Sequence, residues 1–321
     1  EKVINFKKND IVVLEVSSAQ LESIDLFHPL ISCITNMKPE HMNLYGTFEN
    51  YVSAKKNIFK NQTFFDYCIL NYDDQVCRKL AQLANAKILY FSRTQELDKG
   101  VFLKNGKIYI SYNGIKEYIC EIDKFKVMGM LESAMISIII GFLMGISIEI
   151  IRESLYSFGG IEHRLEYVNM IKGVTYINDS KSTNPYSTIH ALETIDNPII
   201  LISGGKDDKN SNFDELAKLL KHKVKLLITM GQTADKIIRS AYANGFTNVR
   251  KVYSMDEAVL LAYSEANEND YVLLSPACNS KDMFKSHKHR GSTFKNLVHK
   301  LEGYSIPSYP MPYERQSLTK V

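Results

Sequence analysis

The sequence predicts an α/β protein of two domains, the second built on a doubly wound, mainly parallel, Rossmann-like sheet. A chain of 321 residues is expected to form about two domains, at roughly 150 residues per domain. Beyond Gly159-Gly160, short apolar runs alternate with helix-like segments, as in parallel βαβ units. The glycine pair therefore marks the expected boundary between a first domain at 1–159 and a second at 160–303.

The first domain is expected to begin with a buried strand. Ile11–Val16 is a short, apolar, β-branched run that ends beside the carboxylate of Glu15. Asn105-Gly106 and Asn113-Gly114 predict the turns of a three-stranded meander. In chain order, the other expected elements are an apolar run at 30–34, a helix at 48–60, a strand at 67–71, a helix to 83, a strand at 87–92, the meander at 101–122, and helices at 131–144 and 148–158.

The second domain shows the alternating pattern most clearly. Its expected strands are 175–178, 199–203, 226–230, 249–252 and 271–274, with helices near 184–194, 213–221, 233–243, 255–266 and 287–302. Ligands of such a sheet gather at the carboxyl ends of its strands. Residues 304–321 hold three prolines and no periodicity, which predicts a flexible tail.

Bulk composition excludes several classes of protein. A net charge of +3, without a tract of like charges, gives no reason to expect nucleic acid or a membrane as a partner. Five scattered cysteines without a C-x-x-C pair fit a reducing compartment and argue against a disulfide framework or a zinc knuckle. The longest apolar run, 135–148, falls short of the roughly 18 to 20 residues that span a bilayer, so it predicts a buried helix. Because the chain begins with Glu1 rather than Met, we expect a processed N-terminus or a fragment.

Three side chains of the first domain are expected near the carboxyl edge of its sheet. Glu15 ends the first predicted strand, His41 lies on the loop after the run at 30–34, and Lys55 lies early on the following helix. A carboxylate, an imidazole and a lysine converging there could hold a divalent metal beside a phosphate. A lone residue of each type is more often a solvated surface group, so spacing alone favours the structural interpretation.

A denser group of polar residues lies at the start of the second domain and after its first strand, at 160–166 and 178–185. Asp179, Ser180 and Thr183 are suitable helix caps and turn formers. However, an aspartate, a lysine and hydroxyl groups at an anion-attracting helix N-terminus also suit a nucleotide or a carboxylate. We favour the functional interpretation here.

Two more segments follow predicted strands. The segment at 202–209 is a glycine turn, but neither G-x-x-x-x-G-K-[ST] nor G-x-G-x-x-G occurs in the chain. The missing dinucleotide fingerprint counts against a nicotinamide-dependent oxidoreductase. The segment at 273–284 contains Cys278, which has no locally placed histidine or acid to activate it. We therefore interpret this cysteine as structural.

Four segments, taken together and in order, resemble the Mur ligases, and most closely the D-glutamate-adding (MurD) type. They are E-x-S-S-x-Q-L-E at 15–22, G-x-x-H-R-L-E at 160–166, N-D-S-K-x-T-N at 178–184 and L-S-P-A-C-x-S at 274–280. The last segment is the most discriminating, because related ligases for other amino acids carry different sequences there. The resemblance runs from about Ile11 to Leu301.

This resemblance implies three family domains: one that grips a UDP-sugar, a central ATPase domain, and a C-terminal domain that binds the incoming amino acid. The present chain would hold the remainder of the central domain, followed by the C-terminal one. The implied activity is ATP-dependent addition of D-glutamate to UDP-N-acetylmuramoyl-L-alanine through an acyl phosphate, in cytoplasmic peptidoglycan precursor synthesis. We expect a monomer with no nucleic-acid or membrane partner.

The resemblance also implies roles for single residues. Glu15 would hold a magnesium ion between the β- and γ-phosphates of ATP, and His41 and Lys55 would bind a second magnesium. Lys55 would be carried as a carbamate, because an ammonium has no lone pair for a metal. Arg164 and Asp179 would contact the phosphates and ribose of ATP. The residues that would receive the D-glutamate carboxylates or the reacting carboxyl group are Lys181, Thr183, Lys209 and Ser280.

The sequence departs from the family pattern at several places. The family's G-x-H-N-x-x-N appears as Gly129–Met135, where both asparagines are replaced. The loop at 204–209 is one residue longer than usual, and His287 stands where an aromatic residue is expected. The G-K-[ST] phosphate loop, which should precede Glu15, does not occur in the chain. We therefore expect no ligase turnover from this chain alone, and the alternative function is that of a non-catalytic nucleotide- or glutamate-binding relative or an inactive fragment.

Overall fold

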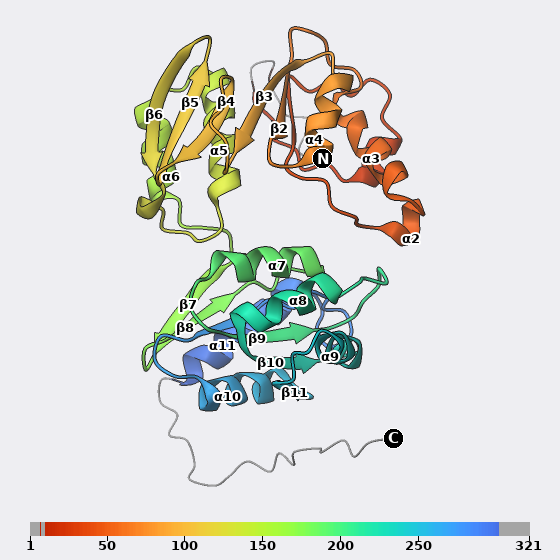
Figure 1. Ribbon diagram of the computed structural model, residues 1–321, viewed down its shortest axis with the longest axis vertical. Helices are drawn as coiled ribbons and strands as arrows, with labels where there is room; N and C mark the ends of the chain where they lie inside the picture. The colour runs from red at the N-terminus through yellow and green to blue at the C-terminus, as the bar shows by residue number, and fades with distance from the viewer. Residues whose placement is uncertain (1–6, 8–9, 302–321) are drawn as a thin grey trace. The chain divides into compact units, whose positions relative to one another are not determined.

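The computed structural model describes residue 7 and residues 10–301. They form two compact units, divided after Gly160, and each is built on one six-stranded, mainly parallel sheet (Figure 1). The predicted α/β class is confirmed. The predicted tail at 304–321 lies outside the described residues.

The sheet of the first unit combines a parallel half with an antiparallel meander. Its strands, in their order across the sheet, are β1 (Ile31–Ile34), β2 (Tyr67–Asn71), β3 (Lys87–Ser92), β4 (Gly100–Lys104), β5 (Lys107–Tyr112) and β6 (Ile115–Glu121). Strands β1 to β4 pair in parallel, whereas β4, β5 and β6 pair antiparallel. Asn105-Gly106 and Asn113-Gly114 have positive φ throughout, as tight hairpin turns require. The predicted meander is confirmed.

Helices cover both faces of this sheet. They are α1 (Ser18–Glu22), α2 (Met42–Tyr45), α3 (Phe48–Lys56), α4 (Gln75–Leu80), α5 (Leu131–Leu143) and α6 (Ile148–Ser157). Ile69 packs with α5 and α6, whereas its neighbours Cys68 and Leu70 pack with α3 and α4, as the alternating sides of a strand dictate. Met135 and Ile138 of α5 are fully buried, but α5 ends at Leu143, and Met144 and Ile146 are 37% and 43% exposed. The buried helix predicted for the run at 135–148 is therefore confirmed only for 135–143. No helix in the described part of the chain combines the length and apolarity needed to cross a bilayer.

The predicted buried strand at Ile11–Val16 is wrong. Ile11, Val13 and Leu14 are 70%, 88% and 62% exposed, and among the described residues no strand pairs with them. A strand needs a neighbour for its backbone groups and a layer over its side chains. Among the described residues, this segment has neither a paired strand nor a covering layer.

The second unit is doubly wound. Its strands are β7 (Glu166–Ile171), β8 (Val174–Asn178), β9 (Ile199–Gly204), β10 (Val224–Met230), β11 (Val249–Lys251) and β12 (Tyr271–Leu274), in the order β11-β10-β9-β12-β8-β7. All of them pair in parallel except β7, which is antiparallel to β8. Sequence patterns did not predict β7, because this edge strand leaves Tyr167 and Met170 exposed and so shows no apolar run.

The helices of this unit lie on opposite faces of the sheet, with α7 (Pro185–Thr194), α8 (Asp214–Lys223) and α9 (Ala234–Ala243) on one, and α10 (Met255–Glu265) and α11 (His287–Lys300) on the other (Figure 1). Phe294 of α11 lies with Ile200 of β9 and Val272 of β12 in the hydrophobic core between the sheet and helices α10 and α11. After β11 the chain returns to place β12 between β9 and β8. The carboxyl ends of these three strands therefore lie at a topological switch point, where ligands of such sheets bind.

Candidate active site

In the first unit, the three side chains assigned to metal binding line one pocket of about 410 Å³. The lining residues are Glu15, Val16, Ser17, Ser18, Gln20, Glu40, His41, Tyr51 and Lys55. Glu15 is placed there by the start of α1. Ser17 caps this helix by accepting from the backbone N of Gln20 at 3.3 Å, and the Gln20 side chain accepts from the backbone N of Ser17 at 2.9 Å. Part of the E-x-S-S-x-Q-L-E segment is therefore a capping box that directs the chain beside Glu15.

His41 and Lys55 come from the next two helices. His41 has a left-handed backbone, with φ of 58°, at the N-terminus of α2, and its Nε2 lies 3.8 Å from Oε1 of Glu40. Lys55 lies on α3, with its Nζ 5.3 Å from the ring centroid of Tyr51. Burial, with Glu40 nearby, raises the pKa of Tyr51, which stays a neutral wall of the pocket. Carboxylate oxygens and an imidazole nitrogen are suitable ligands for a divalent cation.

Glu40 is a pocket residue that the sequence analysis did not assign. Its carboxylate lines the same pocket as Glu15, and its side chain is 30% exposed. Its position immediately before His41 was the available signal. The pocket therefore contains two carboxylates, which are hard oxygen ligands, and one imidazole, which is a borderline nitrogen ligand.

In the second unit, backbone hydrogen bonds join the segments that follow β8, β9 and β12. The backbone N of Asp179 donates to Leu274 O at 2.8 Å. Lys206 and Asn279 exchange two backbone hydrogen bonds, of 2.8 and 3.0 Å. The glycine turn, the N-D-S-K-x-T-N segment and the L-S-P-A-C-x-S segment therefore meet at one edge of the sheet, as the neighbouring positions of β8, β12 and β9 require.

The glycine turn after β9 is explained by close backbone approach. Gly204 and Gly205 have φ of 120° and 135°. A Cβ atom would lie 2.0 Å from Met230 O at the first position and 2.2 Å from Asn279 O at the second. Any side chain here would force the strand ends apart.

Asp179 lies beneath this edge rather than on its surface. Its side chain accepts from the backbone N of Leu165 at 3.2 Å and from Ser275 Oγ at 2.7 Å, and the residue is 2% exposed. Burial raises the pKa of Asp179 to about 6, although hydrogen bonds from Ser182 and Ser275 oppose the rise. These contacts join the segment at 160–166 to the end of β12. The assignments of Asp179 and the exposed Arg164 to ATP stay predictions.

The four residues assigned to D-glutamate also follow these strand ends. Lys181 is exposed, while Thr183 and Lys209 are half-buried. Ser280 is 1% exposed, and its Oγ has no hydrogen-bond partner among the described residues. An unsatisfied buried hydroxyl costs about 1–3 kcal/mol, so this group is available to a ligand at a place where the fold itself does not use it.

Arg290 of α11 is an organising residue that the sequence analysis did not assign. It is 1% exposed and donates to Ser180 Oγ at 3.0 Å, Ser180 O at 2.9 Å and Cys278 O at 3.0 Å. Burial lowers its pKa to about 10, which leaves the guanidinium charged at neutral pH. Cys278 is itself buried, and burial raises the pKa of its thiol to about 12, in keeping with a structural cysteine. The sequence offered one signal, namely a basic residue soon after the last strand.

A second acidic cluster, Glu162, His163 and Glu166, brings its ligand atoms within 4.8 Å of one another. Lys295 already occupies this cluster, with Nζ 3.0 Å from Glu162 and 2.6 Å from Glu166. His163 is buried between Asn178 and α11, where a side chain in place of Gly291 would lie 2.3 Å from its Nδ1. We interpret the cluster as a structural ion pair.

The two units thus define an α/β protein built on two mainly parallel sheets. Residues 2–132 match the family model described as Mur ligase middle domain, and residues 163–278 match the model described as Mur ligase, glutamate ligase domain. The chain belongs to the Mur ligase family, as its four sequence segments predicted.

Several proteins of this family are similar to the chain. A UDP-N-acetylmuramoylalanine–D-glutamate ligase of Clostridioides difficile is 45% identical over 92% of this chain and 65% of that protein. A ligase of the same name from Lachnoclostridium phytofermentans is 39% identical over 94% of this chain and 67% of that protein. The chain therefore spans about two thirds of the length of these relatives. The crystal structure of MurF ligase from Thermotoga maritima in complex with ADP matches with a TM-score of 0.58 at 16% identity, over 85% of this chain and 63% of that one.

Proposed function

We propose that this chain serves the ATP-dependent addition of D-glutamate to UDP-N-acetylmuramoyl-L-alanine, in cytoplasmic synthesis of peptidoglycan precursors. The observation that carries the proposal is Ser280, whose buried hydroxyl has no partner among the described residues. It lies in the segment that most closely resembles D-glutamate-adding ligases, and relatives of that name are 39–45% identical to the chain.

Glutamate carries two carboxylates, and the edge of the second sheet supplies groups that suit them. Lys181 and Lys209 provide positive charge, while Thr183 and Ser280 provide hydroxyl donors. In a partly buried site, charge-assisted hydrogen bonds of this kind are about twice as strong as neutral ones. Arg290 holds the segments that carry Lys181 and Ser280 in fixed positions through Ser180 and Cys278. We assign this edge to binding and orienting D-glutamate.

The pocket of the first unit suits ATP and magnesium. The bound ADP of the Thermotoga maritima MurF structure supports a nucleotide in this family. Glu15 would hold one Mg²⁺, and His41 with a carbamate on Lys55 would hold a second, to which Glu40 of the same pocket would add a carboxylate. Bound Mg²⁺ would neutralise phosphate charge as the γ-phosphoryl group of ATP moves to the substrate carboxylate and ADP leaves. The amine of D-glutamate then attacks the acyl phosphate, and phosphate leaves as the amide forms.

A second candidate function is non-catalytic binding of nucleotide or glutamate. The replaced asparagines at 129–135 favour it, since one of the family's two asparagines helps to hold adenine. We propose that the protein acts as a monomer in either case.

Direct binding of D-glutamate tests the glutamate site. In a titration of the chain followed by NMR, we expect D-glutamate to shift signals of residues that follow β8, β9 and β12, and to bind more tightly than L-glutamate. Ser280→Ala should weaken this binding. Equal binding of both enantiomers, or no binding, would remove the support for a D-glutamate ligase.

A further inference from the structure

The loop after β9 winds around one carboxylate. Asp207, whose side chain is 10% exposed, accepts from the backbone N of Lys209 at 3.3 Å. It also accepts from the backbone N of Ser211, which lies 3.0 Å from one carboxylate oxygen and 2.9 Å from the other. Backbone N–H groups that donate to one carboxylate in this way fix the path of the loop around it. The Asp207 carboxylate therefore fixes the backbone position from which the Lys209 side chain extends.

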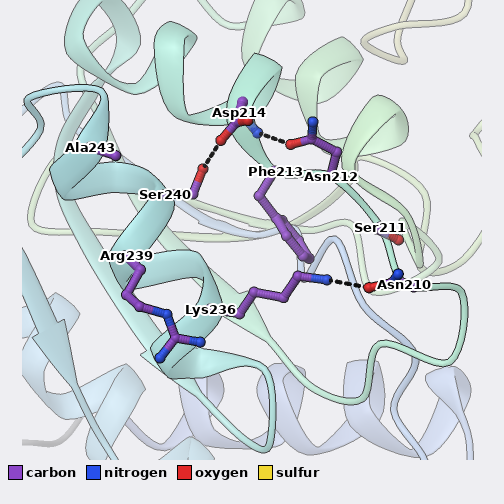
Figure 2. A pocket seen from close by; sticks show the side chains of 9 residues that line it. All are labelled: Asn210, Ser211, Asn212, Phe213, Asp214, Lys236, Arg239, Ser240 and Ala243. Atoms are coloured by element: carbon purple, nitrogen blue, oxygen red, sulfur yellow. Dashed lines mark hydrogen bonds between the residues drawn. The ribbon is translucent and has the colours of Figure 1, made fainter.

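Lys236 of α9 holds the same carboxylate from the helix side. Its Nζ donates to Asp207 Oδ2 at 2.8 Å and to Asn210 Oδ1 at 3.2 Å, and it lies 5.5 Å from the ring centroid of Phe213. Figure 2 shows Lys236 reaching from its helix across to Asn210, with Phe213 alongside, in a pocket of about 480 Å³. One ammonium thus contacts three positions along the loop.

The charge state of the pair is compatible with this arrangement. Burial acts to raise the pKa of Asp207, but hydrogen bonds from Lys236 and Ser211 outweigh it and hold the pKa below its ordinary value. Asp207 is therefore ionised at neutral pH, where a lysine ammonium is also charged.

The near end of the loop is held separately. Lys206 is joined to Asn279 by the two backbone hydrogen bonds described above. Asp208 adds a second contact there, since its Oδ2 accepts from Asn279 Nδ2 at 3.1 Å, and the far end of the loop enters α8 at the buried Phe213. The freedom of a loop between two anchors grows with its length, so contacts along the loop restrict its path. Between these anchors, Lys236 contacts the loop at Asp207 and Asn210, on either side of Lys209.

We propose that Lys236 is a positioning residue for D-glutamate. By binding Asp207 and Asn210, it fixes the loop after β9 on α9 and presents Lys209 to a glutamate carboxylate. This inference rests on the proposed function, in which Lys209 contacts D-glutamate. Lys236 itself is assigned no contact with substrate.

The test compares three single variants of the chain. Lys236→Met removes the ammonium but keeps a stem over Phe213, and Lys236→Arg restores the charge. Lys251→Met is the matched control, because Lys251 is 37% exposed, as Lys236 is, and forms an ion pair of 2.7 Å with Asp235 on the same helix. We expect the Kd for D-glutamate, from NMR titration, to rise about tenfold in Lys236→Met. It should return to within about twofold in Lys236→Arg and stay unchanged in Lys251→Met.

Two further measurements separate positioning from general loss of structure. Asp207→Asn should weaken D-glutamate binding as Lys236→Met does, and the double variant should be no weaker than either one, because both changes break the same link. Independent, multiplying losses would contradict the inference. In the complete ligase, Lys236→Met should raise the KM for D-glutamate and leave the KM for ATP unchanged.

The outcomes distinguish this inference from the function on which it rests. If the native chain binds D-glutamate and Lys236→Met binds it equally well, the positioning role is wrong while the proposed function stands. If the native chain does not bind D-glutamate, both are wrong. Should Lys236→Met fail to show a thermal unfolding transition, Asp207→Asn and Lys236→Arg decide in its place, and native affinity in Asp207→Asn would overturn the inference.

Discussion

Arg290 donates two hydrogen bonds to Ser180, one to its hydroxyl at 3.0 Å and one to its carbonyl at 2.9 Å. A third hydrogen bond, to Cys278 O at 3.0 Å, joins the same guanidinium to the segment after β12. Ser180 directly precedes Lys181, and Cys278 lies two residues before Ser280. One buried charge therefore fixes the two segments that carry three of the four residues assigned to D-glutamate.

Arg290→Met should lower the free energy of unfolding by about 3–5 kcal/mol, because three buried acceptors lose a charged donor. Denaturation by urea measures this change. Lys288→Met on the same helix is a suitable control, since Lys288 is exposed, and it should alter stability by less than about 0.5 kcal/mol. A loss below about 1 kcal/mol in Arg290→Met would show that the segments after β8 and β12 are held by other contacts.

Ser280→Ala and Ser275→Ala should have opposite effects on stability. Ser280 Oγ is buried without a partner among the described residues, so its removal should stabilise the unliganded chain by up to about 1 kcal/mol while weakening D-glutamate binding. Ser275 Oγ donates to Asp179 at 2.7 Å, so its removal should destabilise the chain by about 1–2 kcal/mol. Thermal unfolding of both variants measures the difference. A destabilised Ser280→Ala would mean that this hydroxyl already serves the fold.

Asp179 should make stability depend on pH. Its pKa is raised by burial from an ordinary 3.8 to about 6, so the folded chain binds a proton more tightly than the unfolded chain. The stabilisation is complete below about pH 4 and is lost as the pH rises through 6, by roughly 3 kcal/mol in total. The difference in unfolding free energy between the native chain and Asp179→Asn, measured from pH 4 to 7, isolates this contribution. A difference that does not change with pH would contradict the raised pKa.

In the full product of the reading frame, Lys55→Ala should abolish the proposed D-glutamate addition, because the carbamate that would bind Mg²⁺ cannot form. Short carboxylic acids should partly restore activity by supplying the missing oxygen ligand. Lys56→Ala, at the next position of α3, should retain activity, since Lys56 does not line the pocket. The rate of phosphate release measures the activity of Lys55→Ala, its restoration by added acids, and the activity of Lys56→Ala. Full activity in Lys55→Ala would rule out the carbamate.

Sequence patterns predicted the elements whose signals are local. Strand β3 and the meander follow from apolar runs and Asn-Gly turns, and the alternation beyond Gly160 predicted the doubly wound sheet. The same patterns led to the wrong strand at Ile11–Val16, because an apolar β-branched run carries no information on whether a neighbouring strand is present. They also missed β7, whose pairing is decided by β8 rather than by its own composition.

The candidate site divides in the same way. Glu15, within a recognisable segment, and His41 and Lys55, which follow predicted elements, were assigned from the sequence, and the three share a pocket. Arg290 and Lys236 could not be predicted, because each acts on segments distant in sequence that only the folded sheet brings within reach. Ser17 and Gln20 lie in the E-x-S-S-x-Q-L-E segment that resembles the family, yet their side chains form the capping box of α1. A residue in such a segment can therefore serve the fold.

The most direct test of the account uses the complete product of the reading frame that contains this sequence. With ATP, Mg²⁺ and UDP-N-acetylmuramoyl-L-alanine, mass spectrometry should detect UDP-N-acetylmuramoyl-L-alanyl-D-glutamate when D-glutamate is supplied, and no corresponding product with L-glutamate. If D-glutamate gives no product while the protein still binds ATP, the chain is not part of a D-glutamate ligase.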